Sequence, residues 1–289
     1  MKLTEIYAKK KNVLSFEIFP PKKDDELKDI EPTLDVLCEL SPDYISVTFG
    51  AGGSSNNNKT IALAKKIKEV YHVEPVVHLT GLCYDRHEID EFSKQIADQG
   101  IENVLALRGD RNPDRIEKDD FKHASDLISY LKQTTDFCIL GACYPEDHPD
   151  SPDHVSEMLN LRKKVDAGAD ILVSQLFFDN ENYYRFTEDC AIAGINCPIT
   201  PGIMPVIKEK QIRRMVETCG ANLNEKFERI LRSYGADPDA LFEAGMIHAL
   251  SQVVDLLANN VDGIHLYSMN NPDVAKRICD GIRCLIKRP

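Results

Sequence analysis

Short apolar runs alternate with longer segments of helical period along the whole chain. The runs are rich in β-branched and aromatic residues, which favours strands. The predicted strands are residues 13–19, 44–49, 74–79, 103–107, 137–142, 171–175, 198–200 and 263–267. The predicted helices between and after them are residues 25–40, 58–71, 86–99, 121–133, 154–167, 180–193, 240–259 and 272–286. Most strands recur at intervals of about 30 residues, the length of a βαβ unit.

The stretch between the last two predicted strands is about twice as long as the other connections. It must carry extra helices, near residues 208–219 and 225–234. Eight β/α pairs at this chain length favour a single α/β fold of the (β/α)8 TIM barrel type, with a doubly wound open sheet as the alternative. No linker, repeat or low-complexity segment divides the chain. We therefore predict one domain over residues 1–289.

One acidic residue interrupts the first apolar run. Glu17 lies in the middle of residues 13–19, a run apolar enough to be buried on both faces of a parallel sheet. A carboxylate there is costly unless it is paired, hydrogen-bonded or protonated. Removal from water favours the neutral form of a carboxyl group, which suits it to deliver a proton. The alternatives are a structural salt bridge and a strand at the edge of its sheet.

Polar groups follow nearly every predicted strand. Active sites of (β/α)8 barrels form at the carboxyl ends of the strands, so these groups would converge on one mouth. In strand order they are Glu17, Thr48 with residues 49–53, His78 with Thr80, Arg108 with Gly109 and Asp110, residues 144–148, Gln175, Pro201 with Gly202, and residues 267–270.

Other kinds of site are less well supported. His78, His148 and His154 with nearby aspartates could suggest a metallohydrolase, but no HxH follows the first strand and the histidines lack ligand spacing, so we predict no metal. The glycine-rich residues 50–53 form neither a Walker A loop nor a GxGxxG motif. They could bring backbone N–H groups to a phosphate or form a simple turn. No serine or cysteine occupies a nucleophile elbow.

Composition and charge exclude several classes of partner. The chain is 43% apolar and 28% charged, which is ordinary for a soluble protein with a sizeable core. Its formal net charge of −12 argues against nucleic acid or an anionic membrane as a partner. No apolar stretch approaches the roughly 18 to 20 residues of a membrane span, and the first residues lack the features of a secretory signal. Nine cysteines without a CxxC pair indicate reduced thiols, so we expect a cytoplasmic protein.

Eight motifs taken together resemble the methylenetetrahydrofolate reductase family. They are SFEIFPPK at 15–22, SVTFGAG at 46–52, LRGD at 107–110, YPEDHP at 144–149, NLRKKVDAGA at 160–169, QLFFD at 175–179, PGIMP at 201–205 and HLYSMN at 265–270. The resemblance covers essentially the whole chain, in order and with near-constant spacing. It implies the same eight-stranded barrel that the hydrophobic pattern favours.

The resemblance also implies a bound FAD. The family's flavin-contacting positions fall on Thr48, His78, Arg108, Gly109, Asp110, Tyr144, His148, Asn160 and Lys164. Glu157 falls where the family can have an acidic ribose or adenylate contact, and Ala142 lines the same path. Lys164, with Lys163 or Arg162, can neutralise the diphosphate, although such a cluster is also typical of a solvated helix face.

Two carboxyl groups acquire chemical roles from the resemblance. Glu17 resembles the family's general acid, which protonates the folate so that the N5,N10-methylene bridge opens to a 5-iminium cation. Hydride from the flavin then produces 5-methyltetrahydrofolate. Asp110 resembles the carboxylate that tunes the flavin and helps to bind the pterin, and Gln175 and Gln211 fall on substrate-contacting positions. NADH or NADPH would reduce the flavin first in the same cleft, a ping-pong cycle with NADH the expected donor.

Some positions depart from the family pattern. Asn271 stands where the pattern has an arginine that can meet the folate glutamate carboxylate. Lys208, Lys210 or Arg213 would have to substitute for it, or binding of the tail is weaker. Met215 occupies a position that is aromatic in some members. These departures bear on the electron donor and the folate tail more than on the fold.

Two other functions stay open at this stage. The chain could be the catalytic subunit of a larger assembly in which a partner protein supplies the electrons. It could also be a pterin-binding methyl-transfer barrel without redox chemistry. For the leading hypothesis we expect a homo-oligomer that binds a folate and a nicotinamide nucleotide.

Overall fold

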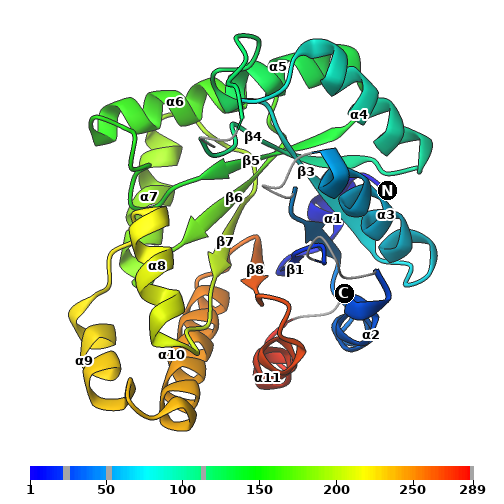
Figure 1. Ribbon diagram of the computed structural model, residues 1–289. Helices are drawn as coiled ribbons and strands as arrows, with labels where there is room; N and C mark the ends of the chain where they lie inside the picture. Colours follow the sequence, from blue (N-terminus) through cyan, green and yellow to red (C-terminus); the bar gives the residue numbers. More distant parts are fainter. Residues whose placement is uncertain (22–26, 50–53, 112–114, 287–289) are drawn as a thin grey trace.

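Eight parallel strands, in chain order, form a closed barrel in this computed structural model (Figure 1). The first strand pairs with both the second and the last. The strands are β1 (Val13–Ile18), β2 (Tyr44–Val47), β3 (Glu74–Thr80), β4 (Asn103–Leu107), β5 (Cys138–Cys143), β6 (Ile171–Leu176), β7 (Ile199–Ile203) and β8 (Gly263–Tyr267). The predicted (β/α)8 barrel is therefore confirmed, and the open sheet is excluded.

The structure describes residues 1–21, 27–49, 54–111 and 115–286, and only the backbone of residues 54–57, 211 and 214. The predicted glycine-rich loop at residues 50–53 and the side chain of Gln211 lie outside this description. The helices are α1 (Leu3–Lys9), α2 (Glu31–Glu39), α3 (Ser54–Glu69), α4 (Arg86–Asp98), α5 (Ala124–Thr134), α6 (His154–Asp166), α7 (Asn180–Ile192), α8 (Glu209–Cys219), α9 (Glu225–Tyr234), α10 (Pro238–Ala258) and α11 (Pro272–Ile282), with a 3-10 turn at Leu27–Ile30.

Side chains that alternate along each strand separate two layers of packing. On β1, Leu14, Phe16 and Ile18 face the helices and belong to the large core between sheet and helices. Val13 faces the barrel interior, where it packs in a smaller cluster with Tyr44. A barrel interior is normally filled by branched apolar side chains. Here the interior becomes polar toward the carboxyl ends of the strands, and this change sets up the site.

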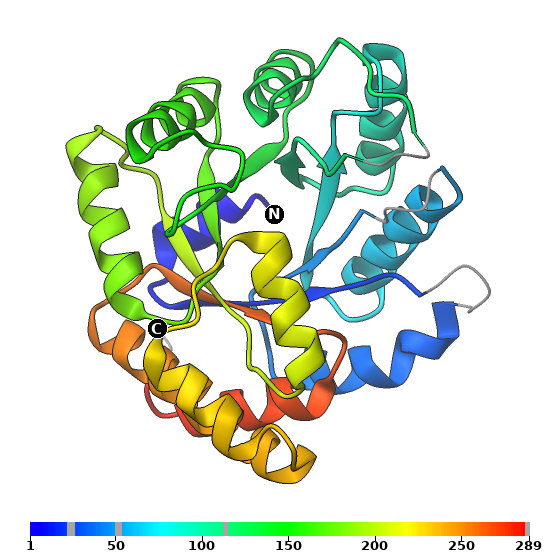
Figure 2. The same ribbon diagram turned by 60° about the vertical axis from the view of Figure 1, so that its left-hand side comes forward.

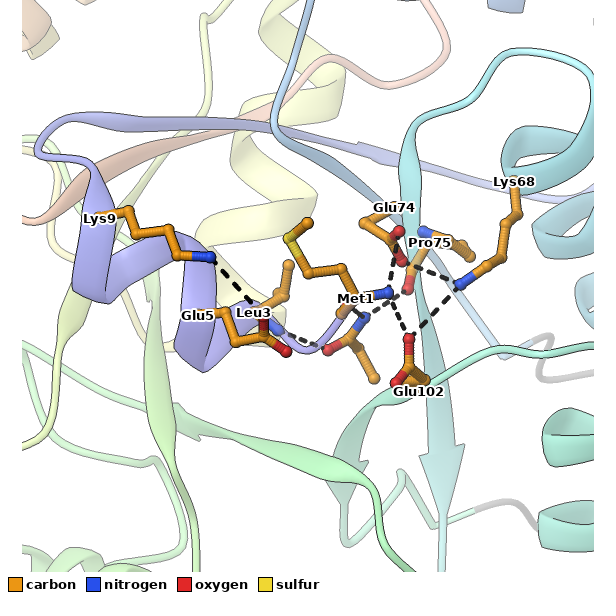
Figure 3. A network of polar contacts seen from close by, with 9 residues as sticks. Met1, Leu3, Glu5, Lys9, Lys68, Glu74, Pro75 and Glu102 are labelled. Carbon is orange, nitrogen blue, oxygen red and sulfur yellow. Dashed lines mark hydrogen bonds and ion pairs between the residues drawn. The ribbon is translucent and has the colours of Figure 1, made fainter. Parts of the chain in front are cut away.

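The amino-terminal end of the barrel is closed by α1, a helix that the sequence analysis did not predict. Leu3 is fully buried there, and its N–H donates to Asn103 Oδ1 at 2.8 Å. The amino group of Met1 lies 3.0 Å from a Glu74 carboxylate oxygen and also pairs with Glu102 (Figure 3). Hydrogen bonding to this amino group lowers the pKa of Glu102. Charges at this end of the barrel are thus paired with one another.

The long connection between β7 and β8 contains α8, α9 and α10, as predicted. In Figure 2, α8 lies across the barrel, drawn in yellow-green. Among the described residues, α10 is the one helix long and apolar enough to cross a membrane, and half of its apolar window is buried. It packs against α7, α9 and α11, which accounts for its apolar character.

Two boundaries differ from the prediction in an instructive way. Pro201 and Gly202, expected to follow the seventh strand, lie inside β7. A Cβ at Gly202 would lie 2.3 Å from the Ser174 carbonyl oxygen and 2.5 Å from the Tyr267 ring, so glycine permits this close strand approach. The predicted helix at 25–40 is a 3-10 turn over Leu27–Ile30 that becomes an α-helix at Glu31, and residues 25 and 26 lie outside the description. Pro32 lies in the first turn of the α-helix, where a missing N–H costs nothing.

Candidate active site

A cavity of about 1030 Å³ opens at the carboxyl ends of the strands. Its lining brings together groups from most of the strand ends and from α8. From the sequence-predicted set it includes Glu17, Thr48, His78, Arg108, Gly109, Asp110, Ala142, Tyr144, His148 and Gln175. Lys210, Met215 and Thr218 of α8 line the same cavity. Such a volume is large enough for a cofactor and part of a substrate.

Glu17 lies at the carboxyl end of β1 with its side chain 13% exposed. Its Oε2 is 3.6 Å from His78 Nε2 and 3.9 Å from His265 Nε2. Among the described residues, these two imidazoles are its ion-pair contacts, and no lysine or arginine joins them. A closed barrel has no sheet edge. The edge-strand alternative is therefore excluded, and a structural salt bridge would need one of the two imidazoles as its cation.

His78 is a buried imidazole beside Glu17. It is 5% exposed, and its Nε2 has no hydrogen-bond partner among the described residues. Burial lowers the pKa of His78 to about 4, outweighing the opposing effect of Glu17. The imidazole is therefore neutral near pH 7, and its unpartnered nitrogen is available to a ligand or to the Glu17 carboxyl group.

His265 is a residue that the sequence analysis did not assign to the site. Ser15 Oγ lies 2.7 Å from its Nδ1, which leaves Nε2 facing Glu17. The ring also stacks on Tyr44, with centroids 6.0 Å apart. This contact follows from the parallel register that sets Ser15 of β1 beside His265 of β8. The sequence signal was the polar alternation Ser15–Glu17, which places both side chains on one face of the strand.

The β4 and β5 ends form a second polar group in the cavity. Arg108 Nη1 donates to Asp150 Oδ2 at 2.8 Å, and His148 packs edge-on against Tyr144 with centroids 4.6 Å apart. Burial and the neighbouring Arg108 charge lower the pKa of His148. Gly109 has φ +89°, and a Cβ there would lie 2.9 Å from Thr80 Cβ. Glycine therefore lets the backbone turn tightly beside the cavity.

Four predicted cofactor contacts lie on α6, next to the cavity lining rather than in it. Lys164 Nζ donates to the carbonyl of Ala142 at 2.9 Å, and burial lowers its pKa. Glu157 is buried and accepts a hydrogen bond from Ser151. Asn160 and Lys163 are exposed, and Lys163 Nζ lies 3.4 Å from Asn160 Oδ1.

Arg162, the remaining cation of this cluster, has a structural role. Its Nε donates to Asp166 Oδ1 at 2.8 Å, and its Nη1 donates to the carbonyl of Ala193 at 2.8 Å. The guanidinium thus holds the end of α7 against α6. It is not positioned to neutralise a diphosphate, whereas Lys163 and Lys164 remain candidates.

The remaining part of the cavity lining comes from β6, β8 and α8. Gln175 lines the cavity, and its Oε1 accepts from the N–H of Leu176 at 2.9 Å. Tyr267 donates its hydroxyl to the Ser174 carbonyl at 2.7 Å, and burial raises its pKa well above the usual range. Within the described ranges, no group of three or more His, Cys, Asp or Glu side chains is arranged to hold a metal ion.

Comparison of the sequence with known proteins identifies the family of this chain. A sequence model described as methylenetetrahydrofolate reductase matches residues 2–283. The 5,10-methylenetetrahydrofolate reductase of Pectobacterium carotovorum is 34% identical over 92% of this chain and 88% of its own length. That of Escherichia coli K12 is 33% identical over 92% of this chain and 89% of its own length.

A plant relative and a solved structure extend the comparison. Methylenetetrahydrofolate reductase (NADH) 1 of Arabidopsis thaliana is 34% identical over 93% of this chain, which spans 48% of that protein. Tryptophan synthase from M. tuberculosis superposes with a TM-score of 0.57 at 11% identity, covering 99% of this chain and 97% of that chain. At that identity the likeness shows the barrel fold alone. The sequence relatives go further: the chain belongs to the methylenetetrahydrofolate reductase family of oxidoreductases.

Proposed function

We propose that the protein reduces 5,10-methylenetetrahydrofolate to 5-methyltetrahydrofolate, using FAD that NADH or NADPH has reduced in the same cavity. Besides membership of the family, the position of Glu17 supports this proposal. Glu17 is a nearly buried carboxyl group on the cavity wall, flanked by imidazoles and by no lysine or arginine of the described chain. Such a group is suited to hold a proton and give it to a bound nitrogen.

The residues present fit a flavin. The cavity has the volume for one, and Gly109 on its wall adopts a positive φ that a side chain would strain. The unpartnered Nε2 of buried His78 offers a hydrogen-bonding group inside it. The contacts to the ring system would be completed by Thr48, Arg108, Tyr144 and His148. The contacts to the ribose, diphosphate and adenylate would come from Ala142, Glu157, Asn160, Lys163 and Lys164. When bound, FAD would carry the hydride between the two substrates.

The two carboxyl groups would act at different places. Glu17 would protonate the folate nitrogen whose bond to the methylene carbon must break. The neutral His78 beside it adds no positive charge that would hold Glu17 in its ionised form. Asp110 is exposed at the cavity rim, where its negative charge would oppose charge build-up on the flavin ring and hydrogen-bond the pterin. Gln175 and Gln211 would contact the pterin from β6 and α8.

The experiment that tests this function uses the purified protein under anaerobic conditions. We expect flavin absorbance that NADH bleaches and that 5,10-methylenetetrahydrofolate then restores, with 5-methyltetrahydrofolate as product. The Arabidopsis relative carries NADH in its name, which favours that donor over NADPH. A flavin that neither nucleotide reduces would contradict direct reduction and indicate electrons from a partner protein. A protein that cannot be loaded with FAD would contradict the redox function itself.

A further inference from the structure

Among the described residues, four lysine and arginine side chains line the cavity, and three of them already have partners. Arg108 pairs with Asp150 at 2.8 Å. Arg111 Nε lies 3.6 Å from a carboxylate oxygen of Glu117. Arg115 stacks over the Tyr84 ring at 4.4 Å and donates to its hydroxyl at 3.0 Å. The fourth cation is Lys210.

Lys210 has no ion-pair or hydrogen-bond partner among the described residues, although it lines the cavity. It belongs to the first turn of α8, whose Met215 packs in one cluster with Leu176 and Tyr267. α8 therefore lies beside the ends of β6 and β8. β8 neighbours β1, which carries Glu17. Lys210 thus lies on a helix that borders the cavity beside β6 and β8, next to the strand of Glu17.

Among the neighbouring side chains that the structure describes, none offers a competing cation. Asn271 caps α11, with its Oδ1 accepting from the N–H groups of Asp273 at 3.1 Å and Val274 at 3.3 Å. Arg213 is bound to Glu209 at 2.8 Å, and Lys208 is exposed and outside the cavity lining. A ligand anion that leaves the cavity past α8 would therefore meet Lys210.

We propose that Lys210 binds the glutamate carboxylates of the folate tail and so sets the enzyme's preference for glutamylated folates. This inference rests on the proposed function. A pterin near Glu17 and Gln175 must send its aminobenzoyl-glutamate tail toward the cavity opening, and that tail is anionic at neutral pH. In a chain with net charge −12, an unpaired cation at this place selects for an anion. The flexible lysine stem can follow tails that carry one or several glutamates.

The test compares Lys210→Gln and Lys210→Arg with the control Lys208→Gln, because both lysines are exposed but only Lys210 lines the cavity. Three substrates are used: the monoglutamate and triglutamate of 5,10-methylenetetrahydrofolate, and 5,10-methylenetetrahydropteroate, which has no glutamate. We expect Lys210→Gln to raise KM for both glutamylated folates about tenfold, with kcat within about twofold of the wild type. Lys210→Arg and Lys208→Gln should leave KM within about threefold, and the pteroate should not distinguish any of the proteins.

The outcomes separate this inference from the function on which it rests. An unchanged KM for the glutamylated folates in Lys210→Gln would overturn the role of Lys210. An equal rise with the pteroate would overturn it too, because it would show a general disturbance of α8. Wild-type protein that reduces none of the three substrates would instead overturn the proposed function. Reduction of the flavin by NADH, measured alone, should be the same in all four proteins.

Discussion

At the amino-terminal end of the barrel the charged groups are paired with one another, whereas at the carboxyl end Glu17 faces two imidazoles and no lysine or arginine among the described residues. One network of ion pairs at the amino-terminal end joins Met1, Lys68, Glu74 and Glu102 (Figure 3). Paired, hydrogen-bonded charges add no reactive group. A nearly buried carboxyl group without a lysine or arginine partner is kept at a cost in stability, and such costs are typical of functional sites.

The largest effect on stability should come from the amino-terminal end. Leu3→Ala removes a fully buried side chain that packs inside the barrel. We expect the free energy of unfolding to fall by about 2 to 5 kcal/mol, measured by urea denaturation. Thr4→Ala, in the same helix but exposed, should change it by less than about 0.5 kcal/mol. Folate turnover at 25 °C should stay within about twofold in both variants. Loss of turnover in folded Leu3→Ala would show that the two ends are not separate in function.

The pH dependence of stability should reveal the neutral His78. The pKa of His78 is about 4 in the folded protein, below the usual 6.5. As the pH falls, the imidazole is therefore protonated in the unfolded chain at a higher pH than in the folded protein. Stability from this group is therefore complete above pH 6.5 and is lost as the pH falls toward 4, by up to about 3 kcal/mol. His78→Gln should lose less stability than the wild type over this window. The exposed His87→Gln should follow the wild type, and identical curves for all three proteins would contradict a neutral, buried His78.

Removing the support of His265 should have a smaller effect. Ser15→Ala takes away the hydroxyl group that lies against His265 Nδ1. We expect the folate half-reaction to slow about tenfold, while reduction of the flavin by NADH is unchanged. The matched control is Ser46→Ala, since the buried Ser46 Oγ has no hydrogen-bond partner among the described residues and its loss should be neutral. Equal slowing of both half-reactions in Ser15→Ala would indicate a disturbed barrel instead of a displaced Glu17 partner.

The smallest effect on stability should come from His154, an exposed residue that pairs with two aspartates. His154 Nδ1 lies 2.8 Å from Asp147, and Nε2 lies 3.2 Å from Asp189. Hydrogen bonding to Asp147, the larger cause, and to Asp189 raises the pKa of His154. Its contribution to stability is present below pH 6.5 and is lost as the pH rises through the raised pKa. Because these groups are well exposed, His154→Gln should cost less than about 1 kcal/mol at pH 6, with no difference at pH 9. A difference that persists at pH 9 would contradict the electrostatic origin.

The barrel itself could be predicted from the sequence because each strand is a short apolar run and each connection has helical period. β4, β8 and α9 match their predicted bounds. The polar strand ends were also visible, since parallel strands place their carboxyl ends together. Ten of the predicted site residues lie in one cavity for this reason: Glu17, Thr48, His78, Arg108, Gly109, Asp110, Ala142, Tyr144, His148 and Gln175.

Contacts between distant segments could not be predicted. Ser15 and His265 meet only because the first strand pairs with the last, 250 residues away. α1 has a short sequence with little helical pattern, and its place is fixed by burial of Leu3 inside the barrel. Arg162 carries a positive charge that could bind a diphosphate, yet its guanidinium donates to the backbone carbonyls at the end of α7. In each case tertiary packing decided between uses that the residue type leaves open.

Glu17 is proposed to deliver the proton for folate reduction, and single-turnover stopped-flow kinetics of Glu17→Gln would reveal this role. Glutamine keeps the shape of the side chain and removes the proton. We predict that NADH reduces the flavin of this variant at a rate within about threefold of the wild type. Oxidation of that flavin by 5,10-methylenetetrahydrofolate should be slower by about 10² to 10⁴-fold. Equal loss in the two half-reactions, or undiminished oxidation by the folate, would show that Glu17 is not the acid of the folate half-reaction.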